Sequence, residues 1–312
     1  MKLQKKAYLF AFAAIACWST IGSAFKLSLR FLSPVELLFY SSFTACTVLF
    51  AIMLVQGKIG LLTSLTLKQT THSALLGLLN PFLYYVVLLK AYEVLPAQEA
   101  GTLNYIWPLI LVLLSIPLLK QKISMMSILA ILVSFAGIII IASHPDGVLH
   151  PDGVLHPDGV THPDGVLHPD GVTHATGVIL AVGSAVFWAL YWIYNIKDNR
   201  EAVSKLFLNF CFGFLYTLVA IVATGKFRIP AWPGIAGAVY IGFFEMGITF
   251  VLWLNALKFS STTAKVSNLI YLSPFISLII IHFTVGETIY LSTVVGLVFL
   301  VTGILLQQYL KR

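Results

Sequence analysis

The chain has 312 residues, of which 59% are hydrophobic and only 10% charged, and its formal net charge is +7. Soluble domains carry about 25% charged residues, so this chain has too little polar surface to be one. Its charges fall in short clusters between long apolar runs, several of which exceed the roughly 18 residues that cross a bilayer core as a helix. The composition therefore predicts an all-α integral membrane protein that crosses the bilayer many times.

Ten apolar segments follow one another along the chain, and we expect each to be a transmembrane helix. The first begins after the cationic stretch MKLQKK and has no small-residue cleavage site, so it is expected to be a retained span rather than a removed signal peptide. Glycine and proline inside the segments are compatible with membrane helices. The ten expected spans are 7–27, 34–55, 73–93, 97–119, 124–143, 177–196, 204–224, 234–256, 262–284 and 289–309.

Lysine and arginine positions predict the orientation of these spans. With the N-terminus inside, thirteen of these residues lie on the inner side and four on the outer side, while Lys90 and Lys265 fall near or within helix ends. Inner loops of membrane proteins are enriched in Lys and Arg. Both termini are therefore expected in the cytoplasm. This enrichment of Lys and Arg on the inner side accounts for the positive net charge, so we expect no nucleic-acid partner.

A low-complexity tract joins the fifth and sixth spans, on the outer side in this topology. Residues 144–174 read HPDGVLHPDGVLHPDGVTHPDGVLHPDGVTH, which is five copies of a hexapeptide closed by a sixth histidine. Pro-Asp-Gly favours tight turns, and a proline every six residues excludes a long helix. The tract holds six of the eight histidines, yet their spacing of six matches no recognised zinc pattern. We interpret it as a spacer rather than a metal site, and expect no cofactor.

Removing this spacer exposes an internal repeat. The aligned pairs are Trp18 with Trp188, Ala91 with Ala256, Tyr105 with Tyr271, Pro108 with Pro274, and Gly137 with Gly303. Each half holds five spans, an odd number, so the second half must enter the membrane in the opposite sense. We therefore expect a first five-helix repeat (1–143), a linker (144–176) and a second, inverted five-helix repeat (177–312). Many secondary transporters have this architecture, with the substrate site near mid-membrane between the halves.

Proline interrupts the fourth and ninth spans at equivalent places. Pro108 lacks a backbone donor, so the carbonyl of Asn104 loses its usual helical partner, and Pro274 has the same effect in span nine. An aromatic substrate could stack on neighbouring rings while its ammonium group meets carbonyl oxygens or ring faces. The alternative is that these side chains only pack or bridge helices. The candidate lining residues of these two spans are Asn104, Tyr105, Trp107, Pro108, Tyr271 and Pro274.

Four further spans contribute candidate lining residues. The tryptophans of spans one and six lie around mid-span, away from the interfacial belt where tryptophan usually anchors. Helix packing is the alternative to a cavity role for them. The candidates are Trp18, Ser19, Tyr84, Trp188, Tyr191 and Trp253.

Glu245 is the one carboxylate well inside an expected span. An intramembrane acid is costly and is a functional candidate by default, either as the carrier of a coupling proton or as the partner of a substrate ammonium group. The alternative is a protonated acid that hydrogen-bonds a neighbouring helix. Glu99 and Lys265 begin spans four and nine at equivalent places in the repeats, and we consider them a candidate gating pair across the outer face.

With these features the chain resembles the drug/metabolite transporter superfamily, and its EamA-type members in particular. The resemblance rests on the five-plus-five layout, the tryptophans of spans one and six, the prolines of spans four and nine, and Gly286-Glu287 after span nine. Trp18-Ser19-Thr20, Phe39-Tyr40-Ser41 and the segment 104–108 are most similar to the bacterial aromatic amino acid exporter branch. The resemblance implies alternating access and efflux of amino acids or related metabolites, aromatic amino acids foremost.

Three function classes compete for this chain. A divalent metal transporter would explain the histidine tract, but the expected spans contain no Asp and no cluster of His and Glu. An intramembrane enzyme lacks support because neither HExxH nor GxSxG occurs, and without a GxxxxGK[ST] loop ATP is not the direct energy source. We therefore expect a secondary exporter of small organic solutes, with other metabolites or drugs as alternative substrates. Its partners would be the solute and the bilayer, and a monomer suffices for the fold.

Overall fold

The protein is described by a computed structural model that covers residues 2–120, 125–142, 171–196, 198–225, 229–261, 266 and 268–310. Every regular element in these ranges is helical, so the all-α expectation is confirmed. Seven helical spans are long and apolar enough to cross a membrane. Three shorter apolar helices, Ile128–Ala142, Leu269–Val285 and Leu291–Leu306, complete the expected ten.

Six of the expected spans are single helices, and four are built from shorter pieces. The interrupted spans are the third and eighth, which contain π-helical segments, and the fourth and ninth, which contain the prolines; they occupy equivalent places in the two repeats. The elements are α1 (Lys2–Leu29), α2 (Pro34–Val55), η1 (Ile59–Leu62), α3 (Leu67–Gly77), η2 (Leu78–Leu83), α4 (Tyr84–Val94), α5 (Ala97–Asn104), α6 (Trp107–Leu119), α7 (Met125–Ala142), α8 (Gly171–Ile196), α9 (Ala202–Ala223), α10 (Trp232–Tyr240), η3 (Ile241–Ile248), α11 (Thr249–Phe259), η4 (Asn268–Leu272), α13 (Ser273–Val285) and α14 (Leu291–Leu310).

Two helices begin about two turns before their expected starts. Span three starts at Leu67 because Thr66 and Gln69 form a reciprocal cap, in which each side chain accepts the other residue's backbone N–H. Span six starts at Gly171, inside the hexapeptide tract. The last tract histidine, His174, is therefore helical and buried rather than part of the expected linker 144–176. Residues 144–170 of the tract lie outside the described residues.

The chain forms two compact units. Unit 1 comprises residues 1–86 and 190–286, and unit 2 comprises residues 87–189 and 287–312. Each unit takes chain from both sequence halves. Two of the three boundaries between the units fall inside α4 and α8, and the third falls between α13 and α14.

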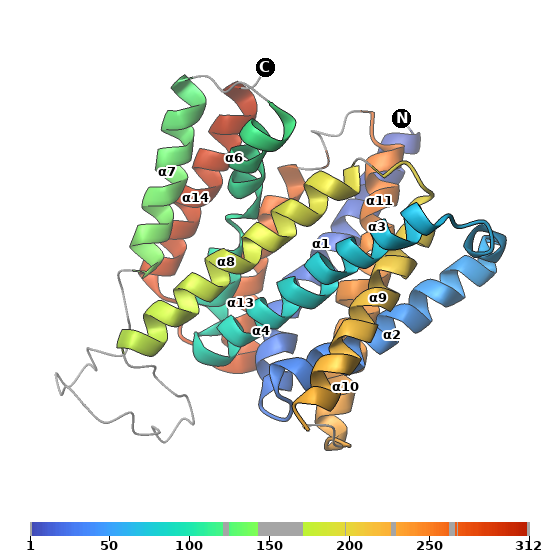
Figure 1. Cartoon of the computed structure of the whole chain (residues 1–312). Helices are drawn as coiled ribbons and strands as arrows, with labels where there is room; N and C mark the ends of the chain where they lie inside the picture. Colours follow the sequence, from blue (N-terminus) through green and yellow to red (C-terminus); the bar gives the residue numbers. More distant parts are fainter. Residues whose placement is uncertain are drawn as a thin grey trace. The chain divides into compact units, whose positions relative to one another are not determined.

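Small residues set the helix packing in unit 1. Ala7, Ala11 and Ala14 lie on one face of α1 and pack against Trp253 and Ala256 of α11. This spacing puts the three alanines on a single stripe, and small side chains let membrane helices approach closely. The pair α2 and α9, which are the second helices of the two repeats, packs in the same unit (Figure 1).

Glycines set the helix packing in unit 2, where α7 and α14 lie side by side (Figure 1). A Cβ added to Gly137 would lie 2.5 Å from the carbonyl oxygen of Gly296, and one added to Gly303 would lie 2.5 Å from the carbonyl oxygen of Ala130. Ser134 also donates to the Leu300 carbonyl across this contact at 3.0 Å. The two glycines aligned by the sequence repeat, Gly137 and Gly303, therefore serve one close helix contact.

Contacts between the segments that connect the spans agree with a chain whose ten spans cross the membrane in alternating directions. In unit 1, the segment after α2 meets the segment before α9 through an ion pair of Lys58 with Glu201 at 2.8 Å. In unit 2, the start of α5 meets both the segment before α14, through Glu287, and the start of α8, through His174. Each pairing joins segments that an alternating chain puts on the same side of the membrane.

Candidate functional site

The expected break in span four is present in unit 2. Helix α5 ends at Asn104 and α6 begins at Trp107, with Pro108 in the first turn of α6. The Asn104 amide donates to Ser184 Oγ of α8 at 2.8 Å, so this asparagine bridges helices. Trp107 meets Trp188 of α8 edge to face, with ring centroids 6.4 Å apart. Tyr105 lies in the break and is half-buried.

The equivalent break in span nine lies in unit 1. The 3-10 helix η4 gives way to α13 with Pro274 in its first turn, and Tyr271 at the junction is buried. Ser19 of α1 holds this junction, because its hydroxyl lies 3.2 Å from the Ser273 carbonyl and 3.1 Å from the Ser273 hydroxyl. Ser19 is therefore a helix-bridging residue in this structure.

The expected lining residues divide between the two units. Asn104, Tyr105, Trp107, Pro108 and Trp188 belong to unit 2, and Trp18, Ser19, Tyr84, Tyr191, Trp253, Tyr271 and Pro274 belong to unit 1. Unit 1 also contains Glu245, and the functional cluster described next lies within it.

Glu245 lies in the π-helical segment η3 and is 7% exposed. Its Oε1 accepts a hydrogen bond from the Tyr85 hydroxyl at 2.9 Å. Its Oε2 is buried and has no hydrogen-bond partner in the described part of the chain. The Trp18 indole lies beside the same carboxyl group. A membrane-embedded carboxyl with one unpaired oxygen is costly, and therefore points to a ligand group or a proton at this position.

Aromatic rings gather around Glu245. Trp18 meets Trp253 with ring centroids 5.4 Å apart and meets Phe250 edge to face at 6.4 Å. Tyr85, the donor to Glu245, packs against Tyr84 at 4.7 Å. The structure thus brings Trp18, Tyr84 and Trp253 together with the acid, in an arrangement suited to a cation and an aromatic ring.

A second buried polar group was missed by the sequence analysis. Asn80 lies in η2 with a non-helical backbone (φ −148°, ψ 120°) and forms a cis peptide with Pro81. It is fully buried, and neither side-chain polar atom has a hydrogen-bond partner among the described residues. It lies beside the Tyr191 hydroxyl, which accepts a long hydrogen bond of 3.4 Å from the Asn209 amide. The Asn-Pro pair within an apolar span was the signal that could have revealed this site.

Asn80 and Glu245 occupy equivalent positions in the two repeats. The offset of 165 residues that aligns Ala91 with Ala256 also aligns Asn80 with Glu245 and Gly77 with Gly242. The packing agrees with this alignment. A Cβ on Gly77 would lie 2.4 Å from the Asn209 carbonyl oxygen of α9, and a Cβ on Gly242 would lie 2.3 Å from that of Ser41 in α2. Each repeat therefore places a buried polar residue three positions after a glycine that packs on the second helix of the other repeat.

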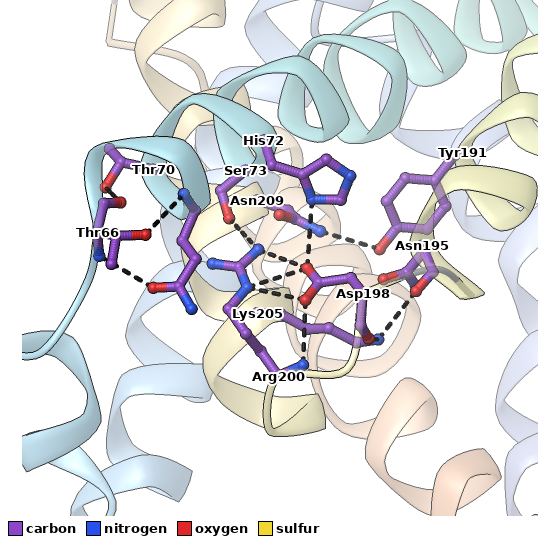
Figure 2. Close-up of polar contacts among 11 residues, drawn as sticks. Thr66, Thr70, His72, Ser73, Tyr191, Asn195, Asp198, Arg200, Lys205 and Asn209 are labelled. Carbon is purple, nitrogen blue, oxygen red and sulfur yellow. Dashed lines mark hydrogen bonds and ion pairs between the residues drawn. The ribbon is translucent and has the colours of Figure 1, made fainter.

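A cluster of charged side chains lies in unit 1 next to Tyr191 and Asn209 (Figure 2). Arg200 binds the Asp198 carboxylate through Nε, Nη2 and its backbone N–H, at distances of 2.6–3.1 Å, and reaches Ser73 of α3 at 2.8 Å. Lys205 donates to two backbone carbonyls rather than to a carboxylate. His72 lies 3.4 Å from Asp198. The cluster ties α3 to the segment between α8 and α9.

The pKa of Asp198 is lowered to about 2 from its ordinary 3.8. Burial alone would raise this pKa, but the hydrogen bonds from the Arg200 side chain and backbone, together with the charges of Arg200 and Lys205, outweigh it. Asp198 is therefore a carboxylate throughout the physiological range.

Of the two candidate gating residues, the structure describes only Glu99. Glu99 hydrogen-bonds His174 Nε2 at 2.7 Å within unit 2, and Lys265 lies outside the described residues. Equivalent positions of an inverted repeat also face opposite sides of the membrane, so a Glu99–Lys265 pair does not follow from the repeat. Nearby, Glu287 accepts from the backbone N–H groups of Ala97 and Gln98 and so caps α5.

The described residues hold no group of three or more His, Cys, Asp or Glu side chains that could bind a metal ion. Cys17, Cys46 and Cys211 are free thiols.

Comparison with known proteins places this geometry in a family. The model of the "EamA-like transporter family" matches residues 5–143 and 175–307, once over each half. The chain belongs to this family. It is thus a multi-pass membrane protein of transporter type with ten helices in two inverted repeats.

Individual relatives are distant and are themselves described as transporters. "Uncharacterized transporter YvbV" of Bacillus subtilis is 25% identical over 83% of this chain and 79% of its own length. An "Uncharacterized transporter" of Clostridium kluyveri is 25% identical over 60% of this chain and 55% of its own. A solved structure described as "Crystal structure of protein" aligns over 98% of this chain and 97% of its own, with a TM-score of 0.64 and 20% identity, which shows the shared fold.

Proposed function

We propose that this family member is a secondary transporter that exports amino acids, aromatic ones foremost, by alternating access. The observation that carries the proposal is the buried Glu245 carboxyl, which Tyr85 bonds at one oxygen and which has no partner at the other oxygen within the described ranges. A protonated amine is the natural partner for such an oxygen, because a charge-assisted hydrogen bond satisfies both groups in a medium of low dielectric constant.

The surrounding rings support an aromatic solute. Trp18, Tyr84 and Trp253 offer faces and edges on which a phenyl or indole side chain can pack. Such rings also attract an ammonium group by cation–π interaction. Acid and rings together suit a solute that carries both groups, which an aromatic amino acid does.

The orientation belongs to the same proposal. Lys58, Arg200 and Lys205 gather where the α2–α3 and α8–α9 segments meet, and the bias of Lys and Arg favours this end as cytoplasmic. Both termini would then be cytoplasmic, in the inner membrane of a bacterium. A cysteine placed in the hexapeptide tract should react with an impermeant reagent from outside intact cells, and labelling only after permeabilisation would contradict this orientation.

Uptake of labelled phenylalanine into proteoliposomes tests the substrate. We expect uptake above that of protein-free vesicles, competed by tyrosine and tryptophan and strongly reduced in Glu245→Gln. Glu93→Gln is the matched control, because Glu93 only pairs with Lys90 on the surface of α4. No uptake in vesicles that hold folded wild-type protein would overturn the aromatic amino acid assignment.

A further inference from the structure

We propose that Asn80, Tyr191 and Asn209 form a second binding site, which holds the carboxylate of a zwitterionic solute whose ammonium group binds Glu245. The inference rests on the proposed function and adds to it a site for the solute's carboxylate, which Glu245 does not bind. It makes Asn80 a specificity-determining residue for amino acids over simple amines.

Unpaired buried polar atoms are the first evidence for this site. Asn80 Nδ2, Asn80 Oδ1 and Asn209 Oδ1 all lack a hydrogen-bond partner in the described part of the chain, and both residues are fully buried. Native structures leave few such groups, because each costs about 1–3 kcal/mol. Asn80 and Asn209 both lie next to the Tyr191 hydroxyl, near a break in a membrane helix, and therefore indicate a place for a polar ligand.

The repeat supplies the second evidence. Asn80 is the counterpart of Glu245. The backbone carbonyl of Asn209 in α9 packs on Gly77, just as the backbone carbonyl of Ser41 in α2 packs on Gly242. The inverted repeat thus builds one architecture twice, once with a carboxylate and once with an amide. A zwitterionic ligand matches this difference, because its ammonium group can bind the carboxylate and its carboxylate can bind the amide. A carboxylate in place of Asn80 would repel the carboxylate of the ligand.

Tyr85 connects the two positions. Its hydroxyl donates to Glu245, and it lies within electrostatic range of Tyr191. Tyr191 in turn meets Asn209 and lies beside Asn80. All five residues belong to unit 1, so the arrangement needs no contribution from unit 2.

The chemistry of the second site suits a carboxylate in this setting. Each asparagine offers an NH₂ donor, and the orientation of a terminal amide adapts to its ligand. Asp198, which acts electrostatically on Tyr191, is already paired with Arg200. The carboxylate of the solute would therefore meet the neutral NH₂ donors of the asparagines here, and the negative charge of Asp198 is balanced by Arg200.

Calorimetric titration of purified protein with phenylalanine and with phenethylamine, which lacks the carboxylate, tests the inference. We expect Asn80→Leu to weaken phenylalanine binding by about 10- to 100-fold, the loss of one hydrogen bond to a charged group, and to leave phenethylamine within about threefold. Asn80→Asp keeps the size of the side chain and should weaken phenylalanine at least as much while retaining phenethylamine. Asn255→Leu is the control, because among the described residues the Asn255 amide bonds the Val251 carbonyl of its own helix and no other group.

The outcomes separate this inference from the proposed function. If wild-type protein binds phenylalanine but Asn80→Leu and Asn80→Asp weaken both ligands alike, or neither, Asn80 has a structural role and the second site is wrong. If folded wild-type protein does not bind phenylalanine, the proposed function fails and the inference fails with it.

Discussion

Glu245 shows how one side chain within the membrane can carry a function. Its neighbour Tyr85 satisfies one oxygen only, and the other lies among aromatic rings without a hydrogen-bond partner among the residues that the structure describes. Burial of an acid in this state is unfavourable unless a ligand or a proton completes it. The sequence predicted Glu245 as a functional residue from its position alone, but Asn80 was not predicted.

For Glu245→Gln we expect phenylalanine affinity to fall by about 10-fold or more, because an amide replaces a charge-assisted hydrogen bond with a neutral one. Affinity for 3-phenylpropionate, which has no ammonium group, should change little. Calorimetric titration of both ligands measures this. An equal loss for both would mean that Glu245 maintains the local structure instead of binding an amine.

Asp198 contributes stability that depends on pH. Because its folded pKa of about 2 is below the ordinary 3.8 of an unfolded chain, the contribution is complete above about pH 4 and disappears as the pH falls towards 2. For Asp198→Asn we expect a lower Tm near pH 7, since Arg200 loses the charged partner that it binds in this partly exposed cluster. The difference from wild type should narrow below about pH 4, and a Tm difference independent of pH would contradict this account.

At the scale of elements, the four interrupted spans carry the distinctive geometry. The breaks in spans four and nine were predicted because Pro108 and Pro274 are visible in the sequence. The π-helical segments η2 and η3 were not predicted. In η2 the Asn80-Pro81 pair is a local signal that the sequence analysis did not use, whereas no local motif marks η3, whose Gly242 packs on a neighbouring helix. The Asp198 cluster was also missed, since it joins Ser73 to Arg200 across 127 residues, which spacing along the chain does not reveal.

Glycine packing between helices gives a direct test at this scale. For Gly242→Ala we expect destabilisation by about 1–3 kcal/mol, because the new methyl group would collide with the Ser41 carbonyl and Thr44 of α2. Gly183→Ala in α8 is the matched control, because a Cβ there has no atom within 4 Å, and alanine favours the helix. Tm values of the two variants in detergent check this, and equal values would refute close packing of η3 on α2.

At the scale of the whole molecule, composition and repeat were enough to predict ten spans in two inverted halves. The contacts between loops agree with that alternation within each unit. The start of span six was predicted too late, because the repeating Pro-Asp-Gly pattern hides the helix that begins at Gly171. His174 at the end of that pattern packs against Glu99 and so belongs to the fold.

Deleting residues 144–167, four copies of the hexapeptide, should leave transport and Tm unchanged, because loop-closure entropy depends weakly on length. His174→Ala should instead lower the Tm, since Glu99 loses a buried hydrogen bond. Uptake and melting assays on both variants check the contrast. Loss of transport in the deletion would show that the tract is more than a spacer.

Solute counterflow tests the central claim most directly, because it detects a carrier whatever its direction and coupling. Proteoliposomes loaded with unlabelled phenylalanine are diluted into a trace of labelled phenylalanine. We expect the label to accumulate transiently above its equilibrium level in wild-type vesicles, and much less in Glu245→Gln vesicles. Simple equilibration, at the rate of protein-free vesicles and with folded protein present, would contradict the account of this chain as an aromatic amino acid transporter.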